Sequence, residues 1–313
     1  MKTVSISHGD IDGVVSAALI ARYTDNVAVR LSATSALPKV IESAMFDIVV
    51  RGADTIIISD LNPSESNHKR IRDILNQYVM AGIRVVWLDH HEWPEGIMDE
   101  YRGLGVEVIV DETRVAAEIV LEYLSNKIKN ILEDRFAQAL VDLAVDDDKF
   151  LNKNPLTLRW RRLLRWYDWE FRRKTVRAFA AGDLWPLWAQ EAYDKIKDEY
   201  DYLLEKTIEN TRIVDVKGYK IVIVPPPSDK VHPGDIQLEL NRKGIHGDIF
   251  VIIYSRGISL RSEKVNVAGI ARALGGGGHT YSAGAPIDNV DVNSIIEVIS
   301  RYLESLKPSQ ISQ

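Results

Sequence analysis

The chain contains no cysteine among its 313 residues. This absence excludes disulfide bonds, thiolate nucleophiles and cysteine-based zinc or iron–sulfur sites, so any metal ion must be held by oxygen and imidazole. No apolar run reaches the roughly 18 residues that suggest a membrane-spanning helix. Met1-Lys2-Thr3 leads straight into an expected strand, without a signal peptide. We therefore expect a soluble, cytoplasmic protein.

Basic residues do not dominate the composition. Lys and Arg total 39 against 45 Asp and Glu, which gives a formal net charge of −6. This balance argues against a protein that coats nucleic acid over its whole surface, but it allows a local basic groove. Hydrophobic residues make up 46% and charged residues 27%, as in ordinary globular proteins. The length suggests about two domains, at roughly 150 residues each.

Three apolar runs end in carboxylates or imidazoles. Val4–Ser7 leads into His8-Gly9-Asp10-Ile11-Asp12-Gly13, Thr55–Ser59 into Asp60, and Val85–Leu88 into Asp89-His90-His91. Buried parallel strands have this apolar character, and open α/β sheets place their ligands at the carboxyl ends of the strands. One Asp after a strand is more often a turn or a helix cap. Three such ends in one sheet indicate a functional site.

The first half of the chain alternates expected strands and helices. The expected strands cover residues 4–7, 27–31, 55–59, 85–89 and 107–110. The expected helices cover residues 13–22, 38–46, about 62–80, 115–124 and 131–145. This alternation predicts an α/β fold with a mostly parallel sheet flanked by helices.

The composition changes near residue 156. Five of the 7 tryptophans lie between residues 160 and 188, interleaved with arginines. Such a mixture can stack bases and neutralise a nucleic-acid backbone. Alternatively it is a helical insertion whose tryptophans form its own core, which we favour for most of them. A groove role stays open for five arginines: Arg161, Arg162, Arg165, Arg172 and Arg173.

The last hundred residues are expected to form a smaller α/β unit. Strands are expected at 219–224, 248–254 and 258–262, and helices at 267–274 and 292–306, with a rigid turn at the prolines 225–227. We predict a catalytic domain at 1–188, whose residues 156–188 are the Trp/Arg-rich segment. A connecting helix at 189–212 and a substrate-binding domain at 213–313 would follow.

The polar strand ends suggest a divalent-metal site. Mixed carboxylate and imidazole ligands suit Mn²⁺, Mg²⁺ or Zn²⁺. There are more ligands than one ion needs, and two ions about 3.5–4 Å apart are a known arrangement for phosphoester hydrolysis. The candidates are His8, Asp10, Asp12, Asp60, Asp89, His90, His91 and the acidic run at Asp146–Asp148.

These motifs resemble a known family. His8-x-Asp10-x-Asp12-Gly13, the strand-terminal Asp60 and Asp89-His90-His91 resemble the DHH phosphoesterase superfamily. Arg261-Ser262, the glycine run ending in His279, and Ala283-Gly284 resemble its DHHA1 substrate-binding domain. The motifs occur in the family's order and span most of the chain.

The resemblance implies a role for each matching residue. His8 and Asp10 would hold one metal ion, and Asp60 would bridge it to a second ion. Asp12, His90 and one acid of the later run would hold the second ion. Asp146 is our choice because it follows an apolar stretch, with Asp142 and Asp147 as alternatives. His91 would face the substrate phosphate, and Asp89 would orient the histidines.

The second domain would bind the substrate. Gly276, Gly277 and Gly278 allow the backbone to approach an anion closely, although a glycine run alone is more often a flexible loop. Arg261 could contact a phosphate with two hydrogen bonds. Ser262 and His279 would complete this substrate-binding set.

These features together predict a two-metal phosphodiesterase, with Mn²⁺ favoured and Mg²⁺ possible. Its substrates would be short single-stranded RNA or DNA, or dinucleotides, as for nanoRNases and RecJ-like exonucleases. A catalytically idle replication scaffold is disfavoured because every motif position keeps a ligand-type residue. A pyrophosphate or polyphosphate hydrolase is disfavoured by the DHHA1-like ending. Two copies could pair through an exposed apolar sheet face.

Overall fold

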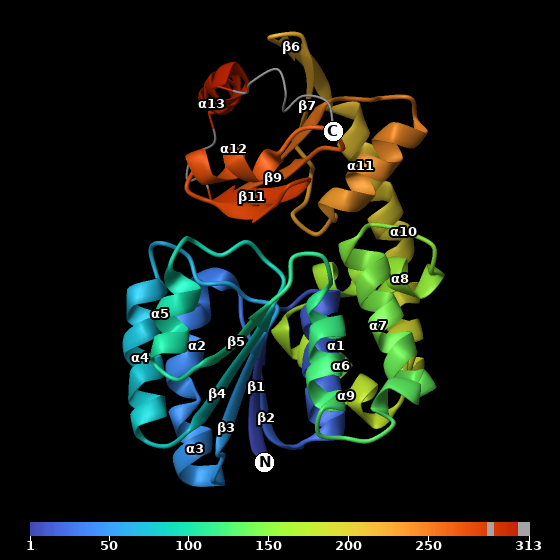
Figure 1. Ribbon diagram of the computed structural model, residues 1–313. Helices are drawn as coiled ribbons and strands as arrows, with labels where there is room; N and C mark the ends of the chain where they lie inside the picture. The colour runs from blue at the N-terminus through green and yellow to red at the C-terminus, as the bar shows by residue number, and fades with distance from the viewer. Residues whose placement is uncertain (287–290, 306–313) are drawn as a thin grey trace. The chain divides into compact units, whose positions relative to one another are not determined.

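The computed structural model describes residues 1–286 and 291–305. The chain divides into two compact units, Met1–Ala192 and Tyr193–Gln313, and each is described by itself (Figure 1). Helix α10 (Leu187–Glu209) begins in the first unit and continues into the second. The division therefore lies inside the helix that we expected to connect two domains.

The first unit contains five parallel strands in the order β2-β1-β3-β4-β5. The strands are β1 (Lys2–Ser7), β2 (Asp25–Leu31), β3 (Thr55–Ser59), β4 (Arg84–Asp89) and β5 (Glu107–Val110). The helices are α1 (Ile11–Tyr23), α2 (Leu37–Ser43), α3 (Met45–Arg51), α4 (His68–Met80), α5 (Ile97–Gly103), α6 (Ala116–Ser125), α7 (Arg135–Asp148), α8 (Pro155–Trp166) and α9 (Trp169–Ala181). The predicted α/β class, with its parallel sheet between helices, is confirmed.

Strand β1 shows how the two faces of this sheet differ. Val4 and Ile6 point into an apolar core shared with α2, α4 and α5, which cover one face (Figure 1). On the other face the small side chain of Ser7 lets α1 approach, and its Oγ donates a hydrogen bond of 2.8 Å to the Gly13 carbonyl. A Cβ on Gly13 would lie 2.5 Å from the carbonyl oxygen of His8. This close approach explains why the motif ends in glycine.

The Trp/Arg-rich segment forms α8, α9 and the start of α10. The ring of Trp160 is fully buried and makes edge contacts with three other aromatic rings, those of Phe179, Trp185 and Trp188. The interpretation of these tryptophans as a helical core is therefore confirmed for this group. Trp169 is different, with 39% of its surface exposed.

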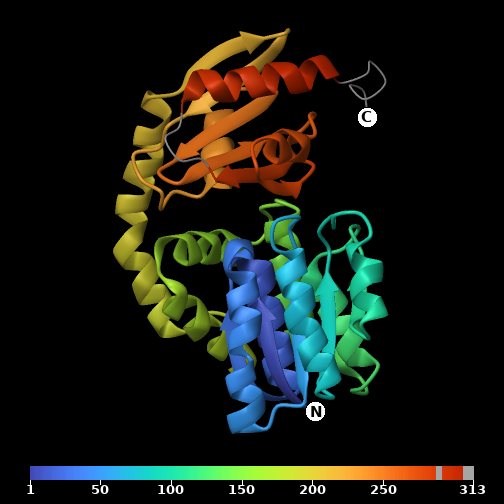
Figure 2. The same cartoon turned by 90° about the vertical axis from the view of Figure 1, so that its left-hand side faces the viewer.

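The second unit has a mixed sheet in the order β10-β11-β9-β8-β7-β6. Its strands are β6 (Arg212–Val216), β7 (Tyr219–Val224), β8 (Ile249–Tyr254), β9 (Gly257–Arg261), β10 (Gly277–His279) and β11 (Ser282–Pro286). Its helices are α11 (Pro233–Arg242), α12 (Val267–Ala273) and α13 (Val292–Ser305). Helices α12 and α13 share an apolar core with the sheet, and Figure 2 shows α13, in red, lying across the strands.

Two local predictions were wrong, and the end of one predicted helix differs. The helix expected from about residue 62 begins at His68, because Ser64–Asn67 forms a hydrogen-bonded turn first. The connection between β7 and β8 holds a whole helix, α11, with Pro233 at its start, as well as the proline turn. The expected connecting helix ends at Glu209, and the next residues form β6.

An exposed apolar sheet face, through which two copies could pair, is not found among residues 1–286 and 291–305. Core residues on both faces of the second sheet, such as Ile221 and Val222, are fully buried. Helices cover both faces of the first sheet. None of the helices in these ranges has the length and apolar character that a membrane span requires.

Candidate metal centre

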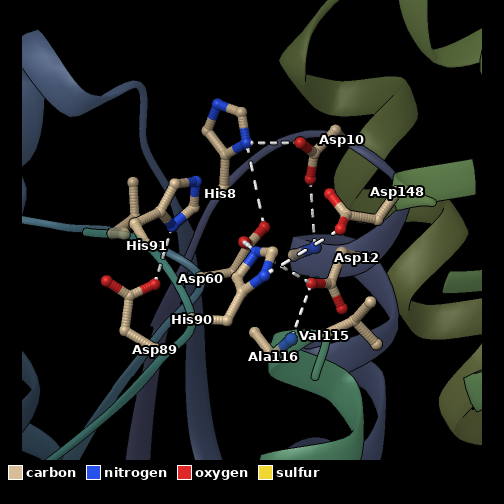
Figure 3. A network of polar contacts seen from close by, with 12 residues as sticks. His8, Asp10, Asp12, Asp60, Asp89, His90, His91, Val115, Ala116 and Asp148 are labelled. Carbon is tan, nitrogen blue, oxygen red and sulfur yellow. Dashed lines mark hydrogen bonds and ion pairs between the residues drawn. The ribbon is translucent and has the colours of Figure 1, made fainter. Parts of the chain in front are cut away.

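The candidate residues lie where the strand order of the first sheet reverses. From β1 the chain passes to the edge strand β2 and then returns to β3 on the other side of β1. Open α/β sheets bind ligands outside the carboxyl ends of the strands at such a point. The segments after β1, β3 and β4 bring the expected residues together there, as Figure 3 shows.

The first group of ligand atoms comes from His8, Asp10 and Asp60. His8 Nδ1 lies 2.8 Å from Asp10 Oδ2 and 3.8 Å from Asp60 Oδ2. Asp10 also caps α1, since its Oδ1 accepts a hydrogen bond from the Gly13 amide at 3.1 Å. One ligand atom from each of the three residues lies within 4.8 Å of the others, which is suitable for one cation.

The second group comes from Asp12, Asp60 and His90, all nearly fully buried. His90 Nε2 lies 3.3 Å from Asp60 Oδ1 and 3.5 Å from Asp12 Oδ2. The Asp12 carboxylate accepts hydrogen bonds of 2.8 Å from the amides of Ala116 and Ala117. These amides are at the N-terminus of α6, where a negative charge is favoured. Helix α6 thus fixes the orientation of the Asp12 carboxylate.

Asp60 belongs to both groups. Its Oδ2 faces His8 and its Oδ1 faces His90. Its backbone adopts a left-handed conformation, with φ of 55°, which is uncommon outside glycine and is concentrated at functional sites. Oδ2 is buried and accepts no hydrogen bond within the described part of the chain. A cation on each side of this carboxylate would satisfy both oxygens.

The pKa values of these carboxyl groups reflect crowding of negative charge. Burial raises the pKa of Asp60 well above its usual range, and the charges of Asp10 and Asp12 raise it further. Burial also raises the pKa of Asp12, together with the charges of Asp148 and Asp10. Divalent cations reverse such effects, because they favour the ionised form of each ligand. The oxygen and imidazole donor set therefore fits Mn²⁺ or Mg²⁺.

Asp89 is fully buried and supports His91. Its Oδ1 lies 2.8 Å from His91 Nδ1, and its Oδ2 accepts a hydrogen bond of 2.7 Å from Trp93 Nε1. Burial lowers the pKa of His91, but the adjacent Asp89 carboxylate, together with the charges of Asp148 and Asp10, raises it to about 9. Trp93 was not predicted from the sequence, although an indole N–H four residues after Asp89 is a possible donor.

The structure places the acidic run differently from our expectation for Asp146. The Asp146 carboxylate accepts hydrogen bonds from the amides of Lys153 and Asn154, so it fixes the loop after α7. The alternative Asp142 is exposed on α7. Asp148 instead faces the centre, with Oδ2 3.9 Å from His90 Nδ1 (Figure 3).

The second alternative, Asp147, is paired with an arginine. Its Oδ1 accepts a hydrogen bond of 2.6 Å from Nε of Arg161 on α8. Arg161 Nη1 also donates to Asn152 Oδ1 at 2.8 Å, and its guanidinium lies 4.6 Å from the centre of the Phe150 ring. The last turn of α7 is thereby fixed with Asp148 toward His90.

The glycine run of the second unit is an edge strand rather than a flexible loop. Gly278 has φ of 135°, and a Cβ on Gly276 would lie 2.0 Å from the Gly284 carbonyl oxygen. In β10, Gly277 and its neighbours pair with β11. The glycines thus allow two strands to approach closely, and Gly277 has open space where a Cβ would be.

The strand register aligns two of the expected substrate-binding residues. His279 pairs with Ser282, and Ser282 pairs in turn with Arg261. Residues directly opposite each other lie on the same face of a sheet, so His279 and Arg261 flank Ser282 on one face. Ser262 is buried instead, and its Oγ bonds the Asp248 carbonyl and the amide of Val265.

Comparisons with known proteins agree with this geometry. Residues 2–145 match the DHH family, N-terminal domain, and residues 218–305 match the DHHA1 domain. Oligoribonuclease NrnB of Bacillus subtilis (strain 168) is 24% identical over 306 residues, which cover 90% of this chain and 72% of that protein.

Solved structures share the fold at low sequence identity. The DHH domain of a member of the s1p family of ribosomal proteins has a TM-score of 0.65 at 15% identity, covering 98% of this chain and 87% of that chain. Exonuclease RecJ bound to manganese has a TM-score of 0.59 at 12% identity, covering 98% of this chain and 91% of that chain.

Proposed function

Because this chain is a DHH-family phosphoesterase with a DHHA1 domain, we propose that it is a metal-dependent phosphodiesterase of short single-stranded oligoribonucleotides. The similarity to an oligoribonuclease over most of both chains supports this substrate class. A RecJ structure of the same fold contains manganese, which supports Mn²⁺ as the cofactor.

The observation that carries the proposal is the position of Asp60 between two groups of ligands. His8, Asp10 and Asp60 would hold one cation, and Asp12, Asp60 and His90 would hold the other. Asp148 would fix the His90 ring from its Nδ1 side. When bound, such a pair neutralises charge on the phosphate oxygens and lowers the pKa of a nearby water molecule.

His91 would supply a proton at the substrate phosphate. Without metal, the Asp89 carboxylate and the charges of Asp148 and Asp10 raise its pKa to about 9, which favours a ring protonated on both nitrogens. The bond from Nδ1 to Asp89 fixes the ring, so Nε2 would donate to a phosphate oxygen. Asp89 thus acts through His91 as a positioning residue, and Trp93 fixes Asp89 in turn.

The second unit would bind another part of the oligonucleotide. Arg261 and His279 lie on one face of the sheet, where a guanidinium and an imidazole can contact a phosphate. The open position beside Gly277 would admit the substrate close to the backbone. Ser262 is assigned to loop structure instead, because its hydroxyl bonds the neighbouring backbone.

The test is a hydrolysis time course with Mn²⁺ on end-labelled RNA and DNA, from dinucleotides to about twenty nucleotides, with pyrophosphate and polyphosphate alongside. We expect cleavage of the shortest RNAs, its loss in Asp60→Ala, and its retention in Asp142→Asn, which changes an exposed carboxylate. Cleavage of pyrophosphate or polyphosphate alone would contradict the proposal. Tight binding of RNA without cleavage would identify a scaffold instead.

A further inference from the structure

Trp169 lies against the loop that carries His8 and Asp10. A Cβ placed on Gly9 would lie 2.5 Å from Cζ3 and 3.0 Å from Cη2 of the indole. The benzene edge of Trp169 therefore rests on the backbone between two candidate metal ligands. Both belong to the first unit, although α9 is distant from this loop in the sequence.

Arg172 fixes the indole in this position. Its Nε donates a hydrogen bond of 2.8 Å to the Gly9 carbonyl, and its Nη1 donates one of 2.8 Å to the Tyr167 carbonyl. The guanidinium carbon lies 5.0 Å from the centre of the Trp169 ring, as in a cation–π contact. The carboxylate of Asp168 caps α9 at the same place.

The exposure of Trp169 needs an explanation that packing does not give. Single exposed apolar side chains are ordinary, but this one is a large ring held rigidly beside the metal centre, with 39% of its surface exposed. A positive charge is adjacent, because the guanidinium carbon of Arg172 lies 5.0 Å from the centre of this ring. A rigid aromatic ring with adjacent positive charge is the combination that binds a nucleotide by its base and its phosphate.

We propose that Trp169 stacks on a base of the substrate beside the cleaved phosphate, and that it selects nucleotides over phosphate chains without bases. This inference rests on the proposed function and adds a specificity-determining residue to it. Arg172 is the positioning residue, since it ties the indole and the Gly9 carbonyl together. Stacking on a ring is tolerant of base identity, so little sequence preference is expected.

The test compares intact pentaribonucleotides with a series in which one nucleotide at a time lacks its base. In the wild type, kcat/KM should fall roughly ten- to hundredfold when the stacked base is removed. On the intact RNA, the kcat/KM of Trp169→Ala should be lower than that of the wild type by a similar factor. For Trp169→Ala, removal of that base should lower kcat/KM only slightly further, because the stacking interaction is already absent. Trp169→Phe should retain most of the activity, and Phe46→Ala, which changes a ring 55% exposed on α3, should resemble the wild type.

A binding measurement separates stacking from a purely structural role. In the Asp60→Ala background, fluorescence anisotropy with a labelled pentanucleotide should show the same coupling between Trp169→Ala and the missing base. If the loss from Trp169→Ala and the loss from the missing base add independently at every position, the inference is wrong. A defect in kcat of Trp169→Ala that does not depend on the base would also overturn it. If the wild type cleaves no oligonucleotide, the proposed function is wrong, and the anisotropy series still decides whether Trp169 stacks.

Discussion

Arg161 and Asp147 form a buried ion pair between α8 and α7, with 2.6 Å between Nε and Oδ1. The Arg161 side chain is 1% exposed. Asp148, the next residue after Asp147, faces His90 at the candidate metal centre. One of the connections between the Trp/Arg-rich segment and the centre therefore consists of one side-chain contact and one peptide bond.

Replacing Arg161 with Met should destabilise the protein strongly. The change leaves the buried Asp147 carboxylate without its cation, and breaking a buried pair in this way costs about 3–5 kcal/mol. The free energy of unfolding in urea measures the effect. Arg177→Met is the matched control, because its pair with Glu170 is exposed and is worth about 0–1 kcal/mol. Equal losses in both variants would contradict the buried role.

Asp148→Asn should change the affinity for Mn²⁺, whereas Asp146→Asn should change the stability of the fold. Asp148→Asn changes the carboxylate beside His90 Nδ1 and should weaken Mn²⁺ binding by the 10–100-fold typical of outer-shell partners, with little loss of stability. Asp146→Asn should reduce stability, because it weakens hydrogen bonds to the amides of Lys153 and Asn154, while metal affinity changes little. Calorimetric Mn²⁺ titration and thermal unfolding report the two quantities, and the reverse pattern would restore Asp146 as the ligand.

The metal-free protein should become less stable between pH 6.5 and 9. The folded-state pKa of His91, about 9, is above its ordinary value of 6.5. The stabilisation is therefore fully present below pH 6.5 and is lost as the pH rises through 9, by up to about 3 kcal/mol. Urea unfolding in EDTA at several pH values measures this slope. Asp89→Asn should flatten it, whereas the exposed His246→Gln should not; an unchanged slope in Asp89→Asn would disprove the assignment.

Removing divalent metal should abolish hydrolysis and lower the melting temperature without unfolding the chain, because the cores of the two units do not depend on the centre. Saturating Mn²⁺ at a hundred times its Kd would stabilise the fold by about 2.7 kcal/mol. Thermal unfolding with EDTA and with Mn²⁺ measures the difference. In Asp60→Ala, most of the increase in melting temperature caused by Mn²⁺ should be lost. A full increase in this variant would mean that the metal binds elsewhere.

Gly13→Ala should destabilise the protein, although alanine is usually favoured over glycine inside a helix by about 0.5–1 kcal/mol. The new Cβ would lie 2.5 Å from the His8 carbonyl oxygen, so β1 and α1 would have to separate. Gly103→Ala, in α5, is the control, because no atom lies within 4 Å of its added Cβ. Urea unfolding should show a loss at position 13 and no loss at position 103.

The parallel sheet and most of the centre could be predicted from the sequence. Apolar strands such as Thr55–Ser59 carry a strong local signal, and their polar ends must meet at one edge of the sheet. Asp148 is instructive, because its own signal was present. It follows Val141 and Ala144 at intervals of seven and four, so it lies on the same side of α7 as these two buried residues, at the exposed end of the helix.

Other features depend on contacts between segments distant in the sequence. Two such contacts leave no periodic pattern in the sequence. One joins Asp12 to the amides of Ala116 and Ala117, and the other places Trp169 against Gly9. The glycine run was uncertain for a related reason. Whether it forms a loop or a strand is decided by its partner β11, since glycine itself has little strand propensity.

The order of the residues at the centre along the chain has a consequence for synthesis. His8 emerges early from the ribosome, whereas Asp148 follows only after most of the first unit has been made. At typical rates of about 5–20 residues per second, the interval is on the order of ten seconds. A nascent chain therefore cannot assemble the complete centre until α7 has emerged, which delays any activity that depends on the centre.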